Sequence, residues 1–381
     1  MRLILGDSLA ELRKLPSESV HCCVTSPPYW GLRDYGTARW EGGDADCNHL
    51  NGPLASPRST LEGYTSDNVK LALGGMPFRE VCGRCGARRI DSQLGLERTP
   101  EEYVANMVEV FREVRRVLRN DGTLWLNLGD SYNAYNGNAG PGPGFSYMAA
   151  CDTERPHLKT GHGLRTKGLK PKDLVGIPWR VAFALQADGW WLRQDIIWAK
   201  PNPMPESVTD RCTKSHEYVF LMAKSQKYYY DAEAIKEDAH DPKKSGKDSC
   251  LVEAARGNNL YRTRMGLQKF NASLVGLDNG KNFDSVGDIH YQRNRRDVWT
   301  VATEPYKEAH FATFPKALVE PMILAGCPKG GVVLDPFFGA GTVGVVALNL
   351  GREFIGIELN QAYCAMAEKR IKEAQAQEKL F

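Results

Sequence analysis

The sequence of 381 residues contains no long hydrophobic run. A membrane-spanning helix needs about 18 or more consecutive apolar residues, and no segment of the sequence provides them. The apolar part of residues 1–8 is too short for a secretory signal peptide and is typical of a strand. The missing apolar runs argue against membrane and secreted proteins and predict a globular protein of the cytoplasm. A large excess of one charge is missing too, since the formal net charge is +3, so the overall charge does not by itself point to nucleic acid.

The cysteines lack the pattern of a disulfide framework. Ten of them are scattered unevenly, several in apolar segments, which is typical of reduced thiols. Two short motifs, Cys47-x-His49 and Cys82-x-x-Cys85, fall inside the irregular residues 37–92. One His and three Cys form a closed tetrahedral set for Zn²⁺, and a metal would stabilise a segment with few apolar residues. We therefore expect a structural zinc ion there; four unrelated residues are the alternative.

A stiff polar corner follows residues 20–24, which predict a buried strand. Its sequence is Thr25-Ser-Pro-Pro-Tyr-Trp30. Each Pro lacks a backbone N–H and restricts the residue before it, so the Ser26 hydroxyl and the carbonyls are held at a strand end, where ligands bind in open α/β sheets. The corner suits a flat base with an exocyclic amine, whose hydrogens Ser26 and the Pro27 carbonyl would accept while Tyr29 stacks on the ring. A Pro-rich turn with a core Tyr is the alternative.

A glycine-rich turn lies near the C-terminal end of the sequence. Residues Gly339-Ala-Gly-Thr-Val-Gly344 match G-x-G-x-x-G between a predicted strand and a predicted helix, and Glu358 ends the next predicted strand. This fingerprint is typical of dinucleotide binding, so NAD is one candidate ligand. Asp335 and Phe337 at the strand end favour instead a sulfonium cofactor that carries an ammonium group and an adenosine.

Strand–turn–helix units dominate the chain. Thr99-Pro-Glu-Glu102 is a capping box with Pro at the first helical position, and an apolar stripe of period 3.6 continues to Leu118. The alternation predicts an α/β protein with a mainly parallel sheet and helices on both faces. Between Arg256 and Arg296 basic residues outnumber acidic ones, which is typical of a phosphate-binding surface. An ordinary solvated surface is the alternative.

The two strand-end motifs together resemble a known family. Asp335-Pro-Phe-Phe-Gly-Ala-Gly-Thr342 is similar to the S-adenosylmethionine motif of amino-methylating DNA methyltransferases, and Thr25–Trp30 is similar to their catalytic motif. The order, catalytic motif first, is that of the β class. Further similar segments are Leu126-Asn-Leu-Gly-Asp130, Trp198-Ala-Lys-Pro-Asn202 and Ser215-His-Glu-Tyr-Val-Phe220. The resemblance implies a circularly permuted, Rossmann-like sheet of about seven strands.

The resemblance also implies a role for each motif residue. The catalytic residues would be Ser26, Pro27, Pro28 and Tyr29; S-adenosylmethionine would be bound by Asp7, Asp335, Phe337, Gly339, Gly341, Thr342 and Glu358. Glu358 would take the ribose, and Asp7 would lie near the adenine while it caps a helix. The substrate would be double-stranded DNA, whose target base must leave the duplex to reach such a corner.

The first residue of the catalytic motif bears on the target base. Among relatives, Ser there favours N4 of cytosine, while Asp or Asn favours N6 of adenine, so methylation of N6-adenine is the alternative. Carbon methylation needs a cysteine nucleophile, usually after Pro, and the chain has no Pro-Cys pair. A zinc-containing DNA-binding protein with an inactive methylase fold is the alternative of another class.

We expect four parts in the chain. Residues 1–36 and 93–230 would form the catalytic part of the methyltransferase domain, 37–92 the zinc-binding insert, 231–305 a target-recognition lobe, and 306–381 the cofactor-binding part. The resemblance leaves open whether a restriction endonuclease is a partner and whether the chain forms a homodimer. It implies a nucleoid-associated enzyme of a prokaryote or a phage.

Overall fold

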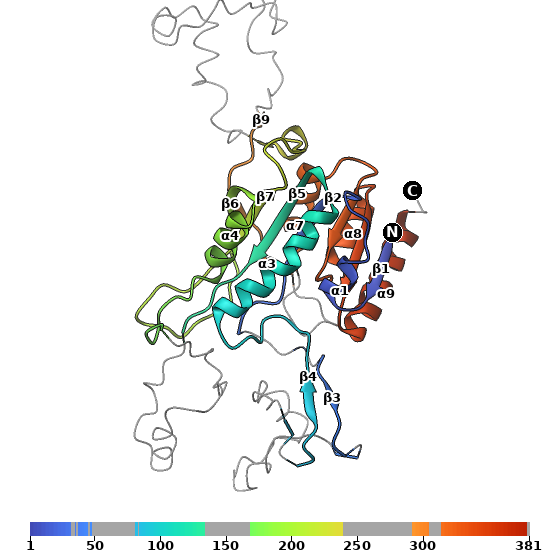
Figure 1. Ribbon diagram of the computed structural model, residues 1–381. Helices are drawn as coiled ribbons and strands as arrows, with labels where there is room; N and C mark the ends of the chain where they lie inside the picture. Colours follow the sequence, from blue (N-terminus) through green and yellow to red (C-terminus); the bar gives the residue numbers. More distant parts are fainter. Residues whose placement is uncertain are drawn as a thin grey trace, which may run out of the picture. The chain divides into compact units, whose positions relative to one another are not determined.

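The computed structural model describes residues 1–31, 35, 37–44, 46–47, 81–82, 84–133, 168–238, 292–304 and 314–378 (Figure 1). The chain forms two compact units: residues 1–231 together with 297–381, and residues 232–296. In the part of the chain that is described, no helix combines the length and the apolar character needed to cross a bilayer.

The first unit is built on one eight-stranded sheet with the order β1-β12-β11-β2-β5-β7-β6-β10. Neighbouring strands are parallel, except that β7 runs against both β5 and β6. The mainly parallel sheet is therefore confirmed, with the short edge strand β10 beside β6. In sheet order the strands are Arg2–Leu5, Glu353–Glu358, Val332–Asp335, Val20–Thr25, Leu118–Leu128, His216–Ala223, Trp191–Ala199 and Val298–Thr300.

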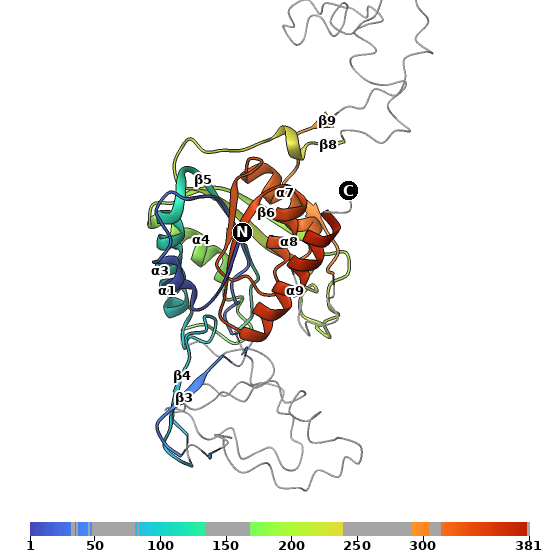
Figure 2. The ribbon, with the colours of Figure 1, turned by 90° about the vertical axis from the view of Figure 1, so that its right-hand side faces the viewer.

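Helices cover both faces of this sheet (Figure 2). On one face α1, α3 and α4 pack side by side, and on the other face α7, α8 and α9 do the same. Their bounds are Ser8–Leu12, Pro100–Val117, Ile177–Ala187, Lys316–Gly326, Thr342–Asn349 and Gln361–Glu378. The first face encloses a large apolar cluster that includes Trp30, Tyr103 and Phe111, all with side chains almost completely buried.

Helix α3 shows how local sequence fixes an element. The Thr99 side chain accepts a hydrogen bond from the Glu102 backbone N–H, and Pro100 occupies the first turn, as the capping box predicts. The apolar stripe of this helix, which includes Met107, Phe111 and Val114, is fully buried against the sheet.

The sheet has a switch point between β11 and β2. Strands β11 and β12 are connected through α8 on one face, whereas β2 and β5 are connected through α3 on the other face. The two connections leave neighbouring strands in opposite directions, which opens a crevice at the carboxyl ends of the strands. Thr25 and Asp335, the last residues of β2 and β11, stand at this crevice.

The second unit contains a 3₁₀ turn, Glu233–Ile235, and two short antiparallel strands, β8 (Glu237–Asp238) and β9 (Gln292–Arg293). Glu237 Oε1 accepts hydrogen bonds from Arg293 Nε at 2.9 Å and Arg296 Nε at 2.7 Å. Most of the predicted target-recognition lobe, residues 239–291, lies outside the described residues.

Candidate active site

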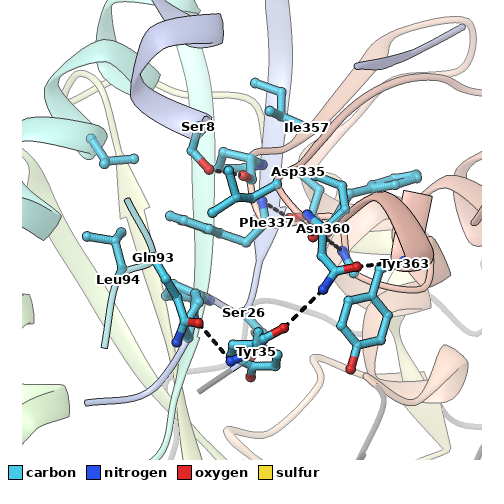
Figure 3. Close-up of a pocket in the computed structure, with 18 of the residues that line it drawn as sticks. Ser8, Ser26, Tyr35, Gln93, Leu94, Asp335, Phe337, Ile357, Asn360 and Tyr363 are labelled. Carbon is cyan, nitrogen blue, oxygen red and sulfur yellow. Dashed lines mark hydrogen bonds between the residues drawn. The ribbon is translucent and has the colours of Figure 1, made fainter. Parts of the chain in front are cut away.

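A cavity of ≈ 410 Å³ lies at the carboxyl edge of the sheet, where the switch point opens the crevice (Figure 3). Residues from both strand-end motifs line it, and Figure 3 shows Ser26 and Asp335 among them. The residues of the cavity that the sequence singled out are Asp7, Ser26, Pro27, Pro28, Tyr29, Asp335, Phe337, Gly339, Thr342 and Glu358. The fold thus brings together segments that are about three hundred residues apart in the chain.

The corner after β2 is held by α3 and by the segment that precedes it. The Pro28 carbonyl accepts a hydrogen bond from the Tyr103 hydroxyl at 3.0 Å. Gly95 has a φ of +91°, and a Cβ atom there would lie 2.8 Å from the Tyr29 carbonyl oxygen, so only glycine fits. The described residues supply no hydrogen-bond donor to the Pro27 carbonyl, which leaves this acceptor for a ligand.

A polar network surrounds the Tyr29 hydroxyl. Tyr29 Oη lies 2.7 Å from Glu217 Oε2 and 2.8 Å from Asn127 Oδ1. Ser26 Oγ lies 3.1 Å from the same Asn127 oxygen and 3.3 Å from Tyr29 Oη. The Asn127 amide is oriented by its Nδ2, which donates to the Tyr218 carbonyl at 3.0 Å. Asn127 lies near the end of β5 and Glu217 near the start of β7, so both reach the same edge of the sheet.

The donors and acceptors of this network determine how Ser26 can bind a ligand. Glu217 Oε2 and Asn127 Oδ1 can only accept, so the single hydroxyl hydrogen of Tyr29 goes to one of them. Burial, and secondly the charge of Glu217, hold the pKa of Tyr29 well above its usual range, so Tyr29 keeps that hydrogen. Ser26 must therefore donate its own hydrogen into the network. Its lone pairs remain for a donor in the cavity.

An ion pair between Lys200 and Glu217 stabilises this network. Lys200 Nζ pairs with Glu217 Oε1, and the two side chains are 17% and 16% exposed. Lys200 Nζ also lies 4.2 Å from the ring centroid of Trp198. The positive charge of Lys200 compensates the negative charge of the Glu217 carboxylate, which accepts a hydrogen bond from the Tyr29 hydroxyl. Both charges are largely protected from solvent.

Asp335 is a buried acid on the other side of the cavity. Its Oδ1 accepts from Thr25 Oγ1 at 2.7 Å and from the Phe337 backbone N–H at 3.1 Å. Burial raises the pKa of Asp335 to about 7, and the charge of Glu358 contributes to the rise. An acid with this pKa ionises more readily when a cation binds beside it.

Glu358 is held by the backbone of two turns. Its Oε2 accepts from the Gly339 N–H and its Oε1 from the Asn360 N–H, both at 2.7 Å. Burial raises the pKa of Glu358 as well. A carboxylate oxygen has more than one lone pair, so both oxygens can still accept from a ligand hydroxyl.

The three glycines of the G-x-G-x-x-G turn differ in what they contact. A Cβ atom on Gly339, whose φ is +51°, would have only the Phe337 carbonyl oxygen nearby, at 4.0 Å, so this backbone is open to the cavity. Gly341, with a φ of +80°, packs against Ala367, where a Cβ would come to 2.9 Å, and it does not line the cavity. A Cβ on Gly344 would lie 2.6 Å from the Phe338 ring. Of the three glycines, Gly339 therefore leaves its backbone open to the cavity, while the other two leave room for packed side chains.

The remaining sequence-predicted residues also have defined places. Asp7 Oδ1 accepts from the Ala10 N–H at 2.9 Å, which confirms Asp7 as the cap of α1, and Asp7 lines the cavity. Thr342 is buried at the start of α8, and Arg370 Nη1 donates to its hydroxyl at 3.1 Å. The Phe337 ring is partly buried and lines the cavity.

Sequence reasoning assigned no role to several residues that line the cavity. These residues include Asn127, Lys200 and Glu217, which lie in segments that resemble family segments. Each is a polar residue near the end of a predicted strand, and this position could have marked it as a candidate site residue. Asn360 and Tyr35 form another contact that was missed: Asn360 Nδ2 donates to the Tyr35 carbonyl at 3.1 Å (Figure 3). No local pattern marks that pair, because the two residues come from opposite ends of the chain.

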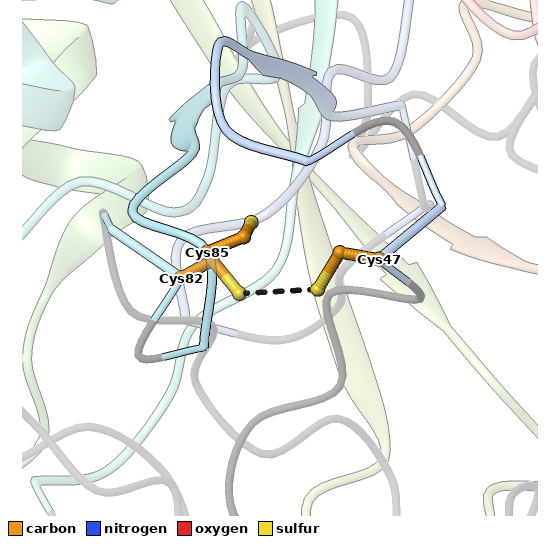
Figure 4. Close-up of side chains that lie close together, drawn as sticks. All are labelled: Cys47, Cys82 and Cys85. Atoms are coloured by element: carbon orange, nitrogen blue, oxygen red, sulfur yellow. Dashed lines mark hydrogen bonds between the residues drawn. The ribbon is translucent and has the colours of Figure 1, made fainter.

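Three of the four predicted metal ligands are brought together away from this cavity. The sulfur atoms of Cys47, Cys82 and Cys85 all lie within 4.8 Å of one another (Figure 4). None of the three residues lines the cavity. The fourth predicted ligand, His49, lies outside the described residues.

Known proteins are similar to this chain along nearly its whole length. The Serratia marcescens protein named Type II methyltransferase M.SmaI is 40% identical over 370 residues, which cover 97% of this chain and 90% of that protein. Type II methyltransferase M.Cfr9I of Citrobacter freundii is 41% identical over 371 residues, with 97% and 87% covered.

A solved structure shares the fold. The PvuII DNA methyltransferase, described as cytosine-N4-specific, has a TM-score of 0.51 at 16% identity, with 98% of this chain and 89% of that chain covered. A family model described as DNA methylase matches residues 20–369. The match spans both motifs and every strand of the sheet except β1, so the chain belongs to the N6/N4 family of DNA methylases and is a DNA methyltransferase that acts on an exocyclic amine of a base.

Proposed function

We propose that this methyltransferase transfers a methyl group to N4 of a cytosine in double-stranded DNA. The observation that supports this most directly is the acceptor-only character of Ser26 toward the cavity, which follows from its contacts with Asn127 and Tyr29. An exocyclic amine presents two N–H donors, and Ser26 Oγ and the Pro27 carbonyl are two acceptors on one rigid corner. Ser as the first residue of the motif favours cytosine; N6 of adenine carries the same donor group and is the second candidate.

The cavity fits S-adenosylmethionine as methyl donor. A volume of ≈ 410 Å³ is within the usual range for a ligand of that size. Asp335 and Glu358 are desolvated acids, which suits a ligand with two positive charges and ribose hydroxyls. The open backbone at Gly339 allows close approach. When bound, S-adenosylmethionine supplies an electrophilic methyl group on its sulfonium sulfur.

The residues of the corner act by orientation. The lone pair of an aromatic amine is delocalised into the ring, and acceptors on its two N–H groups localise it on the nitrogen. Ser26 and Pro27 would accept these hydrogens, and the Tyr29 ring, fixed through its hydroxyl, would stack on the base. A neutral hydroxyl is a weak base, so the amine proton leaves after methyl transfer. Placement of the reacting groups then provides most of the rate enhancement.

Other parts of the chain would bind the remaining partners. Residues 231–305 would form the target-recognition lobe, because basic residues predominate there; changing Arg262 and Arg264 to Gln should weaken DNA binding and leave cofactor binding unchanged.

A restriction endonuclease of the same specificity is the proposed partner, since the similar proteins are named Type II methyltransferases. Digestion by that endonuclease of DNA from cells with and without this chain tests the pairing. The enzyme would act in the cytoplasm of a prokaryote.

A structural zinc ion at the cysteine cluster is a separate part of the proposal. Three thiols whose sulfur atoms lie within 4.8 Å of one another support it. The ion takes no part in the reaction, because the proposed methyl transfer needs no metal.

Nucleoside mass spectrometry tests the proposed reaction. The chain is expressed in a bacterial host without DNA methylation of its own, and the genomic DNA is hydrolysed to nucleosides. We expect N4-methylcytosine with the natural chain and none with the Ser26→Ala chain expressed at the same level. N6-methyladenine would instead establish the second candidate. If neither base is found, the inactive DNA-binding protein becomes the better interpretation.

A further inference from the structure

The cysteine cluster joins the ends of two segments that are distant in sequence. Cys47 follows the strand β3 (Arg39–Glu41), and Cys82 and Cys85 precede the strand β4 (Arg88–Ile90), which pairs with β3 in antiparallel fashion. Cys47 Sγ lies 3.9 Å from Cys82 Sγ. In a tetrahedral site with Zn–S bonds of about 2.3 Å, ligand sulfurs are about 3.8 Å apart. The spacing therefore matches a metal site and is far from the ~2.05 Å of a disulfide.

The backbone around Cys82 is folded into a tight turn. The Cys82 N–H donates to the Ala87 carbonyl at 2.7 Å, and the Gly86 N–H donates to the Cys82 carbonyl at 2.9 Å. Gly86 has a φ of +75°, which a residue with a side chain adopts only under strain. In this turn the sulfur atoms of Cys82 and Cys85 lie within 4.8 Å of each other, which is close enough for two thiolates to bind one ion after a small side-chain rotation.

The opposite segment is shaped to reach these sulfurs. Gly43 has a φ of +72°, and a Cβ atom there would lie 2.8 Å from Cys85 Sγ, so its backbone passes close to the sulfur. The Cys47 N–H donates to the Asp44 carbonyl at 3.1 Å in a turn that brings the third thiol into the cluster. Figure 4 shows the three side chains close together, with a dashed line for the contact between Cys47 and Cys82.

The described residues of the β3–β4 pair have almost no apolar core. In residues 37–47 and 81–90, the buried apolar side chains are those of Cys82 and Ala87. A two-stranded pair without an apolar core is marginal in water, and bound metal would provide the missing stability.

We infer that Cys47, Cys82 and Cys85 bind one structural zinc ion that fixes the β3–β4 pair. Thiolate ligands at tetrahedral spacing select zinc or iron among the common metals, and a single mononuclear site of this kind is most often zinc. The ion lies outside the cavity, so its effect is transmitted through the strands. The segments that precede β3 and follow β4 reach the cavity, where Tyr35 N–H donates to Gln93 Oε1 at 2.7 Å.

The metal content of the full-length chain, purified without a histidine tag or chelator, tests the site directly. Inductively coupled plasma mass spectrometry should find about one zinc ion per chain. Separate Cys82→Ser and Cys85→Ser chains should lose most of it. The matched control is Cys212→Ser, which removes an exposed thiol outside the cluster and should retain the metal. Absence of zinc from the natural chain, iron in its place, or unchanged zinc in both variants would overturn the inference.

Limited proteolysis measures the structural role without relying on activity. Trypsin should cleave at Arg88 or Arg89 in β4 much faster after zinc is removed by a chelator, and added zinc should restore protection. Equal cleavage rates with and without zinc would contradict a structural ion. Neither measurement involves methyl transfer, so failure of the zinc site can be distinguished from failure of the proposed reaction. If a variant does not fold, the metal content and the cleavage rate of the natural chain still test the site.

Discussion

The Tyr29 hydroxyl lies 2.7 Å from Glu217 Oε2, although these residues are 188 positions apart in the chain. Tyr29 belongs to the rigid corner after β2, and Glu217 lies near the start of the antiparallel strand β7. The contact connects the corner to the ion pair with Lys200. The hydrogen-bonding direction of Ser26 is therefore set by residues outside its own motif.

Glu217→Gln should reduce the rate of methyl transfer. The change leaves Lys200 without its carboxylate and offers Tyr29 a weaker acceptor, so the Tyr29 ring and Ser26 lose their fixed orientation. A hydrogen bond to a charged group contributes about 1.5–3 kcal/mol, which corresponds to a decrease in kcat of roughly 10- to 150-fold. Single-turnover assays with labelled S-adenosylmethionine measure the rate. Glu206→Gln is the matched control, because Glu206 also pairs with a basic residue, Arg211, but does not line the cavity. An equal loss in both variants would contradict the prediction.

Ser26→Ala should abolish methyl transfer and leave cofactor affinity unchanged. The variant removes the acceptor for the amine but no group beside Asp335 or Glu358. Isothermal titration with S-adenosylmethionine and a methyl-transfer assay on unmethylated DNA separate the two effects. Ser26→Thr, which keeps the hydroxyl, should retain part of the activity. Near-normal transfer by the Ala variant would remove Ser26 from the mechanism.

The affinity for S-adenosylmethionine should increase with pH. Without cofactor, the pKa of Asp335 is about 7, so the acid is largely protonated at lower pH. A cationic ligand prefers the ionised form, and binding therefore releases a proton. Between about pH 5.5 and about pH 7.5 the affinity should rise by roughly tenfold or more. Titration calorimetry over this range, in buffers of different ionisation enthalpy, measures the affinity and the proton release. A constant affinity would argue against contact between Asp335 and the cation.

Thr25→Val should move this pH dependence upward. The Thr25 hydroxyl stabilises the ionised form of Asp335 through a hydrogen bond of 2.7 Å, and its loss raises the pKa of Asp335 further. The midpoint of the affinity curve should then lie at higher pH than in the natural chain, by the same calorimetric measurement. An unchanged midpoint would assign the pH dependence to another group.

Gly356→Ala should destabilise the fold by displacing the Phe338 ring. A Cβ atom at this position would lie 2.4 Å from the Phe338 ring, which packs in the space that the glycine leaves. Overpacking of this kind typically costs about 1–3 kcal/mol in the free energy of unfolding. Urea unfolding measures the loss. Phe338→Leu in the same chain should recover part of it in a double-mutant cycle, and a purely additive cycle would show that the ring is not the cause.

Local sequence predicts the helices and strands well, but it predicts the contacts between distant elements less well. The capping box at Thr99 fixes the start of α3, and strand-end motifs placed Ser26 and Asp335 at one edge of a parallel sheet. Asn120-Asp-Gly122 consists of residues typical of turns, which favours a strand that starts after residue 122. In the structure β5 begins earlier, at Leu118, and its pairing with β2 shifts register between Val20 and Cys22. Pairing with a neighbouring strand outweighed the local turn preference.

The polar network could not be predicted from the sequence. Glu217 reaches Tyr29 because β7 runs against β5 and so presents its amino end at the cavity. Strand direction and register depend on the whole sheet, and no nearby residue encodes them. The sequence predicted that Cys47, Cys82 and Cys85 lie together, and the structure brings their sulfur atoms within 4.8 Å of one another, while the bound zinc ion stays a prediction.

The hydrogen bond between Thr25 and Asp335 joins residues 310 positions apart in the chain. During synthesis on the ribosome, Thr25 is therefore made long before its partner. The ribosome makes β2 early, but the neighbour that covers one of its edges, β11, emerges only near the end of translation. Until then the growing chain carries an apolar strand with an open edge, which is prone to pair with other chains. Both halves of the cavity come together only in the nearly complete protein, so shortened chains that end before β11 should be inactive and prone to aggregate.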